Sequence, residues 1–429
     1  MVSSRTQPPL LVSNCGQLLT LAGPARPRAS AEMSDVGLVR NGAVLIQNGR
    51  ILRAGAADRV SRSPEARGAR RVDARRRVVL PGFVDSHTHA LFAASRVDEY
   101  VTRLSGATYS QIAKSGGGIQ ASARRVRGAN EAALVSRLQS SVRLFLEHGT
   151  TTAEVKSGYG LDVPQELKLL RVIARVAARG EMDLVPTLLA HDVPARFRRR
   201  RAAFLRLWES RFIPEIARTH LAECFDVFCD RGYFSVAETR RLLTAAARAG
   251  LLLKLHAEQL GRSGAALLAA RMGALSVDHL DHLAERDARR LRAMGTIATL
   301  LPGSVLHLGT GPYPPARRLI GAGVPVAVAT NFNPGSSPTP NMQMILALAC
   351  SQMRMTPAEA IVAATINGAY AVGRGVRVGS LEPGKQADLV IMDVDDYREI
   401  PYFFGMNHCM MTIKNGRVAY DKEGRGASG

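Results

Sequence analysis

The sequence predicts an α/β protein built on a TIM-like (β/α)8 barrel, with a small β domain made from both ends of the chain. Eight apolar, strand-like runs alternate with amphipathic helical runs through the middle of the chain. Short β-like runs separated by turn residues stand before and after them. Five of the ten histidines fall at strand ends, which is where the active sites of such barrels lie.

The two ends of the chain have the same sequence pattern. Residues 38–60 contain two short β-like runs around Asn48-Gly49, and Asn415-Gly416 separates two more near the other end. Asn-Gly between alternating runs is a strong hairpin signal. Because chain termini often lie close together, these segments are expected to form one domain. We therefore divide the chain into residues 1–77, 78–372 and 373–429, with the barrel in the middle.

The eight strand candidates read as continuous apolar runs, which is typical of a parallel sheet covered by helices. Helix signals stand between them: Ser235 with Glu238, and Thr356 with Glu359, have the spacing of capping boxes. The runs are RRVVLPGFVDSHTH, GTTTAEVKSGY, MDLVPTLLAH, FDVFCD, LLLKLHAE, ALSVDHL, TIATLLPG and VPVAVATNFN.

Composition excludes several classes of protein. With 429 residues, 46% hydrophobic and 22% charged, the chain can bury a large core and is not a disordered protein. The formal net charge of +21 raises the question of a nucleic-acid partner. Only seven of the 57 basic residues are lysines, and the densest run, 196–201, has no aromatic platform around it. We expect a basic, solvated surface and no nucleic-acid partner.

Cysteine usage and hydropathy predict a cytoplasmic protein without a membrane partner. The five cysteines are scattered and form no CxxC pair, which favours a reducing compartment. The first 17 residues lack the parts of a secretory signal, and no run approaches the roughly 20 apolar residues of a membrane span.

The sharpest chemical signal is Asp85-Ser86-His87-Thr88-His89. Two histidines two residues apart on a strand project to the same face, so both imidazoles can bind one divalent ion. His256, at the end of another strand, is a natural third ligand. His279 ends a further strand and is a candidate fourth ligand, base or carbonyl-polarising donor; spacing does not choose among these roles.

Several stretches together resemble one family, imidazolonepropionase of the amidohydrolase superfamily. They are PGFVDSHTHALFAASRVDE, GATYSQIAKSGGGI, AEVKSGYGLD, HAEQL, NFNPGSSPT and ATINGAYA. The resemblance runs from about Val36 to Val418. It implies a metal-bearing barrel with a β-sandwich built from both ends, one zinc or iron ion, and a homodimer. The reaction implied is hydrolysis of the ring amide of 4-imidazolone-5-propanoate to N-formimidoyl-L-glutamate in histidine degradation.

The resemblance also assigns roles to residues. The metal ligands would be His87, His89 and His256, with the fourth family position at Asn331, and His279 would polarise the ring carbonyl. Arg96 would take the propanoate group in a bidentate grip. Substrate contacts would come from Arg96, Tyr109, Tyr159, His191, Gln259, Asn333, Gly335 and Ser336.

Asn331 departs from the family pattern, because the family has an aspartate there that binds the metal and takes the proton from water. An amide neither accepts a proton near neutral pH nor supplies a negative ligand. Three explanations fit: an enzyme mutated to trap substrate, a catalytically impaired or silent ligand-binding homologue, or an enzyme with another base, such as His279 or Asp281. Another amidohydrolase or deaminase acting on a different heterocycle is a further alternative.

Overall fold

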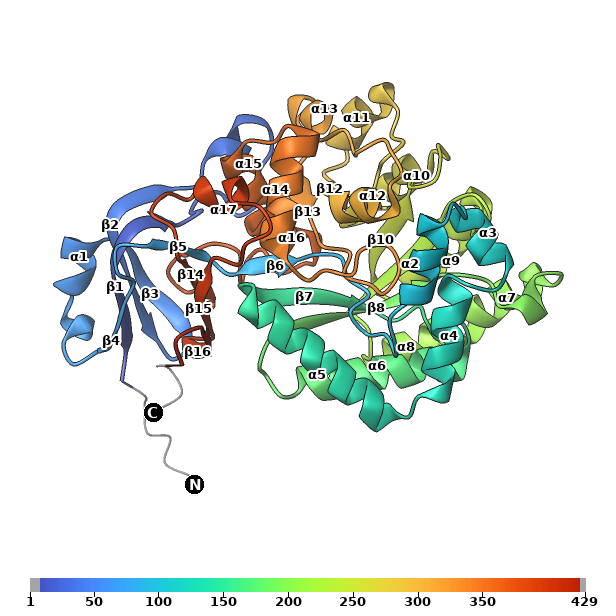
Figure 1. Ribbon diagram of the computed structural model, residues 1–429, viewed down its shortest axis with the longest axis horizontal. Helices are drawn as coiled ribbons and strands as arrows, with labels where there is room; N and C mark the ends of the chain where they lie inside the picture. The colour runs from blue at the N-terminus through green and yellow to red at the C-terminus, as the bar shows by residue number, and fades with distance from the viewer. Residues whose placement is uncertain (1–7, 425–429) are drawn as a thin grey trace.

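The computed structural model describes residues 8–424, together with all their side chains except those of residues 109, 110 and 113. The chain forms two parts side by side, a helix-covered barrel and a mixed sheet that contains both chain ends (Figure 1). Among the described helices, none is both long and apolar enough to cross a membrane.

The barrel contains eight parallel strands that pair in chain order. One strand overlaps each of the eight predicted runs, so the predicted barrel is confirmed. The strands are β6 (Phe83–Asp85), β7 (Thr150–Lys156), β8 (Asp183–Ala190), β9 (Cys224–Cys229), β10 (Leu252–Ala257), β11 (Ser276–His279), β12 (Ile297–Leu300) and β13 (Val326–Val328).

The first and last barrel strands are joined just beyond their ends. The buried carboxylate of Asp85 accepts hydrogen bonds from the backbone N (3.0 Å) and the hydroxyl (2.5 Å) of Thr330. The backbone N of Asn331 donates to the carbonyl of His87 at 3.0 Å, and that of His89 donates to Phe332 at 2.9 Å. These contacts bring the histidine pair and Asn331, which are more than 240 residues apart in sequence, to one point of the rim.

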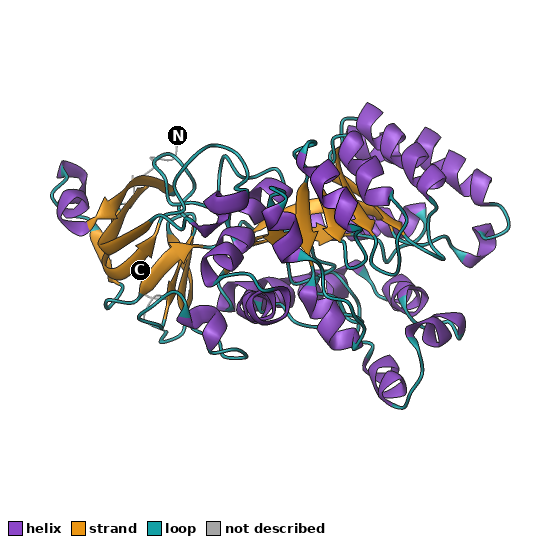
Figure 2. Cartoon of the chain, turned by 90° about the horizontal axis from the view of Figure 1, so that it is seen from above, coloured by secondary structure: helices purple, strands orange, loops and turns teal. Residues whose placement is uncertain are grey.

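Helices surround the barrel (Figure 2). The capping boxes predicted at Ser235 and Thr356 are both present, at the N-termini of α9 and α15. The helices that follow the barrel strands or cover the barrel are α2 (Val97–Leu104), α3 (Tyr109–Lys114), α4 (Ile119–Gly128), α5 (Glu131–Glu147), α6 (Val163–Ala177), α7 (Arg201–Leu207), α8 (Ile213–Thr219), α9 (Val236–Arg248), α10 (Ala265–Arg271), α11 (Glu285–Arg292), α12 (Pro302–Leu308), α13 (Ala316–Gly321), α14 (Met342–Met353), α15 (Pro357–Ala364) and α16 (Ile366–Ala371).

The second part is a mixed sheet with the order β16-β15-β14-β5-β1-β2-β3, and β4 also pairs with β1. The antiparallel pair of β5 and β14 joins the two ends of the chain, as the sequence predicted for a shared domain. Its strands are β1 (Leu10–Leu19), β2 (Leu38–Gln47), β3 (Arg50–Ala56), β4 (Arg70–Asp73), β5 (Val78–Pro81), β14 (Leu389–Met392), β15 (Cys409–Lys414) and β16 (Arg417–Asp421); the short helices α1 (Ala57–Ser61) and α17 (Glu399–Tyr402) complete the chain.

Both predicted hairpins are present, since Asn48-Gly49 connects β2 to β3 and Asn415-Gly416 connects β15 to β16. The first of the eight apolar runs is divided between the two parts: β5 belongs to the terminal sheet and β6 to the barrel. The chain passes between them at Gly82, where a Cβ atom would lie 2.3 Å from the Thr151 hydroxyl. Only glycine allows this close approach. The division at residues 77 and 372 stays a prediction.

Candidate active site

Three buried histidines meet at the mouth of the barrel. His87 and His89 follow β6, and His256 lies on β10. Their ligand nitrogens lie within 4.8 Å of one another, and Nε2 of His89 is 3.3 Å from Nε2 of His256. All three side chains are almost completely buried. The structure therefore brings the three predicted ligands together in an arrangement able to hold one metal ion.

The electrostatics of the site favour neutral imidazoles, the form that binds metal. Burial lowers the pKa of His87 and His89 well below the usual value, and the positive charges of neighbouring groups lower it further. Burial likewise lowers the pKa of His191 to about 3. Its Nδ1 donates to the carbonyl of Gly158 at 3.1 Å, and its ring stacks on that of His89, with 5.1 Å between centroids.

His279 and Asn331 complete the rim. Burial lowers the pKa of His279 well below its usual value, and its ring centroid is 5.3 Å from that of His256. Both residues have left-handed backbone, with φ of +80° for His279 and +51° for Asn331. For histidine this conformation is strained, as often happens at active sites. Asparagine adopts it more readily.

The amide of Asn331 has a fixed orientation. Its Nδ2 donates to the hydroxyl of Ser304 at 2.7 Å, while its buried Oδ1 has no hydrogen-bond partner within residues 8–424. Asn331 also lines the cavity that contains His89, His256 and His279. The oxygen of this side chain is therefore the atom available to a ligand.

Arg96 lies in the same cavity, with only 5% of its surface exposed. Its Nε and Nη1 have no hydrogen-bond partner among the described side chains and backbone, although Glu99 lies 3.8 Å from Nε. A Cβ atom on Gly335 would lie 1.2 Å from Nη2 of Arg96, so glycine leaves the space that the guanidinium occupies. A buried guanidinium with free donors is a strong site for a carboxylate.

Asn333 holds the turn on which Arg96 rests. Its Oδ1 accepts hydrogen bonds from the backbone N of Gly335 and of Ser336, both at 2.8 Å, and its Nδ2 donates to the Ser336 hydroxyl at 2.9 Å. Its polar atoms are thus engaged within the turn, as in an Asx turn.

Most residues that the sequence singled out line this one cavity: His89, Arg96, Tyr159, His191, Gln259, Asn333, Ser336, and the residues His256, His279 and Asn331. Gly335 contacts Arg96, and His87 belongs to the histidine group. The side chain of Tyr109 lies outside the described residues. The cavity walls also contain four apolar residues that the sequence analysis missed: Ile119, Phe228, Leu260 and Leu308.

The sequence analysis also missed the polar residues beneath the histidines. Asp278 lies 2.6 Å from Nδ1 of His87, and Asp226 lies 2.8 Å from Nδ1 of His256. Both carboxylates are fully buried. A charged residue within an otherwise apolar strand was the available signal, since such a residue is almost never buried without a partner.

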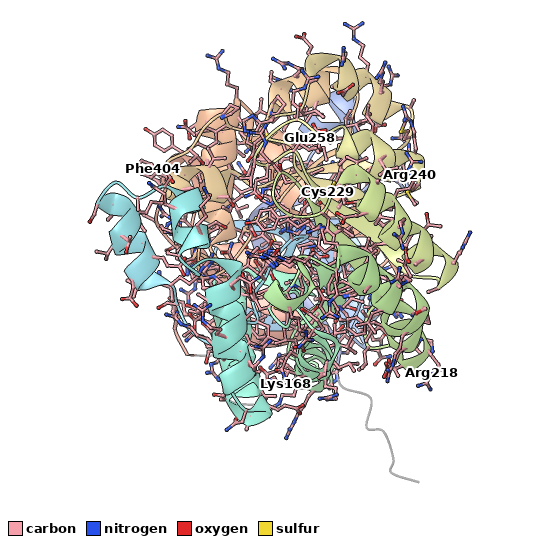
Figure 3. All side chains as sticks on the ribbon, turned by 90° about the vertical axis from the view of Figure 1, so that its right-hand side faces the viewer. Lys168, Arg218, Cys229, Arg240, Glu258 and Phe404 are labelled. Atoms are coloured by element: carbon pink, nitrogen blue, oxygen red, sulfur yellow. The ribbon has the colours of Figure 1, made fainter. Side chains whose placement is uncertain are left out.

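Acidic residues gather beside the cavity at the ends of β9, β10 and β11. Figure 3 shows Cys229, which ends β9, next to Glu258, which follows β10, near the centre of this face. Burial raises the pKa of Glu258 to about 7. Burial, with the negative charge of Asp230, raises the pKa of Asp281 well above its usual value.

Comparison with known proteins identifies the family. Residues 232–419 match the model of the amidohydrolase family. The chain is 46% identical to an imidazolonepropionase of Geobacillus kaustophilus, over 96% of this chain and 97% of that protein. It is 44% identical to an imidazolonepropionase of Solibacter usitatus, over 95% of this chain and 97% of that protein.

Two solved structures of deaminases have the same fold. A zinc-bound adenosine deaminase from Xanthomonas campestris superposes with a TM-score of 0.69 at 19% identity, over 95% of this chain and 92% of that one. The guanine deaminase of E. coli gives 0.70 at 19% identity, over 97% and 100%. At this identity the likeness shows the fold alone. The much higher identity to imidazolonepropionases extends over nearly the whole chain, and the chain therefore belongs to the imidazolonepropionase family of metal-dependent amidohydrolases.

Proposed function

We propose that this protein hydrolyses the ring amide of 4-imidazolone-5-propanoate to N-formimidoyl-L-glutamate in histidine degradation. One observation carries the proposal: a single cavity is lined by His89 and His256 of the three-histidine group and by the buried guanidinium of Arg96. The histidines suit the amide end of such a substrate, and the guanidinium suits its propanoate end.

The residues present fit one divalent ion held by His87, His89 and His256. Two nitrogens bound at about 2.1 Å in tetrahedral geometry lie about 3.4 Å apart. The Nε2 atoms of His89 and His256 are 3.3 Å apart, and Nε2 of His87 is buried with no partner in the described part of the chain. Imidazole ligands accept both zinc and iron, so we propose one ion of either metal. When bound, it supplies Lewis-acid polarisation of the carbonyl and a more acidic water.

The remaining residues bind and orient the substrate. The guanidinium of Arg96 binds the propanoate carboxylate, and the turn at Asn333 and Gly335 holds that guanidinium in place. Tyr159, His191 and Phe228 form the walls against the heterocycle, and Gln259, at the open end, hydrogen-bonds to it.

We assign the proton transfer to His279 rather than to Asp281. His279 lines the cavity, while Asp281 is not among the described residues that line it. The neutral ring of His279 donates a hydrogen bond to the carbonyl through one nitrogen, takes the proton of the attacking water on the other, and passes that proton to the departing ring nitrogen. Asn331 directs its Oδ1 into the same space and accepts a hydrogen bond from the attacking water.

The test is the loss of ultraviolet absorbance of 4-imidazolone-5-propanoate with the purified protein, together with detection of N-formimidoyl-L-glutamate. We expect turnover that a chelator removes and that added zinc or iron restores. Arg96→Met is expected to lower kcat/KM by about 10- to 100-fold, because a charged hydrogen bond contributes about 1.5–3 kcal/mol. Arg124→Met, an exposed arginine of α4, is the matched control. Saturable binding without turnover would instead indicate a silent ligand-binding protein.

We also propose that two copies of the chain associate through an exposed apolar surface near α17. Tyr402, Phe404 and Met406 expose 74%, 72% and 59% of their surface, and Phe404 lies at the outer edge of the view in Figure 3. Beside them is an apolar hollow of about 760 Å³ between α12, α14 and α17. Large exposed apolar patches on soluble proteins mark interaction sites. Sedimentation should give a dimer for the protein and a monomer for Phe404→Glu.

For location, we propose the cytoplasm. The proposal rests on the cysteines, all five of which are free thiols in the structure, as expected of a protein kept in a reducing compartment.

A further inference from the structure

Directly beneath the histidine group, strands β7, β9, β10 and β11 carry five charged side chains with no exposed surface. They alternate with apolar residues along β7, β9, β10 and β11, so all of them point inward. Burying charges in this way is costly unless they are paired. They are Glu154, Lys156, Asp226, Lys254 and Asp278. Lys156 belongs to the KSGYGL stretch, and its charge has no role in the proposed reaction.

Two of these carboxylates hold metal-binding histidines. Oδ2 of Asp226 is 2.8 Å from Nδ1 of His256, and Oδ2 of Asp278 is 2.6 Å from Nδ1 of His87. Nδ1 of His87 is hydrogen-bonded to Asp278, and Nδ1 of His256 lies within ion-pair distance of Asp226, so Nε2 is the nitrogen of both rings that is left for a ligand. Carboxylates in this position fix the tautomer and the orientation of a metal-binding ring.

Lys156 connects the two pairs. Its Nζ is 2.7 Å from Oδ2 of Asp226, the same oxygen that faces His256. It is also 2.7 Å from Oε2 of Glu154 and 3.9 Å from Oδ2 of Asp278. The Lys156 ammonium therefore contacts the carboxylate behind His256 directly, and lies farther from the carboxylate behind His87.

We propose that Lys156 is a positioning residue for the metal site. Its ammonium holds the Asp226 carboxylate in place, and this carboxylate orients His256 toward the ion. The inference rests on the proposed function only in taking the histidines as ligands. Lys156 itself is fully buried and is not among the described residues that line the cavity.

Lys254 provides a control within the same network. It is equally buried and equally charged, but its Nζ donates to the backbone carbonyls of Ser86 (3.0 Å) and Ala371 (3.2 Å). Its nearest carboxylate oxygens are 3.7 Å away, on Glu154 and Asp278. Removing Lys254 should therefore disturb the fold as much as removing Lys156, with much less effect on the ring of His256.

The experiment compares two charge-balanced double variants, Lys156→Met with Glu154→Gln and Lys254→Met with Glu154→Gln. Zinc affinity is measured by competition with a chromogenic chelator, and the geometry of the site by the visible absorption of the cobalt-loaded protein. We expect the Lys156 pair to bind zinc about 10- to 100-fold more weakly and to show an altered cobalt spectrum. The Lys254 pair should retain the cobalt spectrum and nearly all the affinity.

A second charge-balanced variant covers the case in which the Lys156 pair does not fold. If Lys156 acts through Asp226, then Asp226→Asn combined with Lys156→Met should bind zinc no more weakly than Asp226→Asn alone. A further loss of zinc affinity when Lys156→Met is added to Asp226→Asn would overturn the inference. So would equal losses for the Lys156 and Lys254 pairs, or wild-type affinity in the Lys156 pair. Failure of the unmodified protein to bind metal would instead contradict the proposed function.

Discussion

At the scale of single residues, Asn331 stands where the resemblance to the family implies an aspartate. Its backbone has a left-handed conformation that aspartate also adopts readily, and its Nδ2 is bound to Ser304, whose hydroxyl can donate as well as accept. An aspartate therefore fits the same place without strain. The departure changes the chemistry of the site and leaves its shape unaltered.

We accordingly expect Asn331→Asp to raise kcat. A carboxylate accepts the proton of the attacking water, and a general base typically contributes 10²- to 10⁴-fold in rate. The measurement is the ultraviolet assay at matched metal content, with Ser304→Ala in the Asn331→Asp background as a test of orientation. Equal rates for the unmodified protein and Asn331→Asp would mean that His279 already transfers the proton of the water efficiently.

At the scale of elements, the loop after β7 is fixed by a carboxylate from α6. Glu166 is fully buried and accepts hydrogen bonds from the backbone N of Gly158 (2.7 Å), Gly160 (2.9 Å) and Leu161 (2.7 Å). This loop carries Tyr159, which lines the cavity. The side chain that positions one wall of the site thus comes from the helix that follows the loop.

Glu166 also predicts a pH dependence of stability. Burial raises its pKa from 4.5 to about 7 in the folded protein. Because the pKa is raised, the contribution of Glu166 to the free energy of unfolding is complete below pH 4.5 and is lost as the pH rises to about 7. The shift corresponds to about 3 kcal/mol. Urea unfolding should show that, from pH 4.5 to about 7, the metal-free unmodified protein loses more free energy of unfolding than metal-free Glu166→Gln does. Equal losses in the two proteins would contradict the assignment.

At the scale of the whole molecule, one lysine ties the terminal sheet to the barrel. Nζ of Lys414, on β15, lies 2.7 Å from the buried Asp388 carboxylate and 2.9 Å from Asp183, at the start of β8. The side chain of Lys414 is 3% exposed. The ion pairs therefore connect the last strands of the chain to the face of the barrel opposite the active site.

Lys414→Met is expected to reduce the free energy of unfolding by about 3–5 kcal/mol, because it leaves a buried carboxylate without a countercharge. Arg75→Met removes the exposed ion pair with Glu423 and should change the free energy of unfolding little. Urea unfolding measures both, and zinc affinity should be the same in the two variants. An equally small effect of Lys414→Met would mean that hydrophobic packing alone holds the two parts together.

The sequence by itself determined the class of fold, the eight barrel strands, the hairpins at Asn48 and Asn415, and the capping boxes. These are local: each depends on the period of apolar residues or on turn and cap residues within a few positions. The three histidines could be named for the same reason, because strand ends of a barrel converge on one rim.

Only the tertiary structure decided how those residues are supported. Asp226, Asp278 and Lys156 lie on different strands, and their pairing with His256 and His87 depends on side-chain distances across the barrel interior. The seat of Arg96 against Gly335 joins residues 239 positions apart. A sequence shows which residues are charged but not which of them pair in the fold. In a buried site, the pairing determines whether a charge is stable and how a metal-binding side chain is oriented.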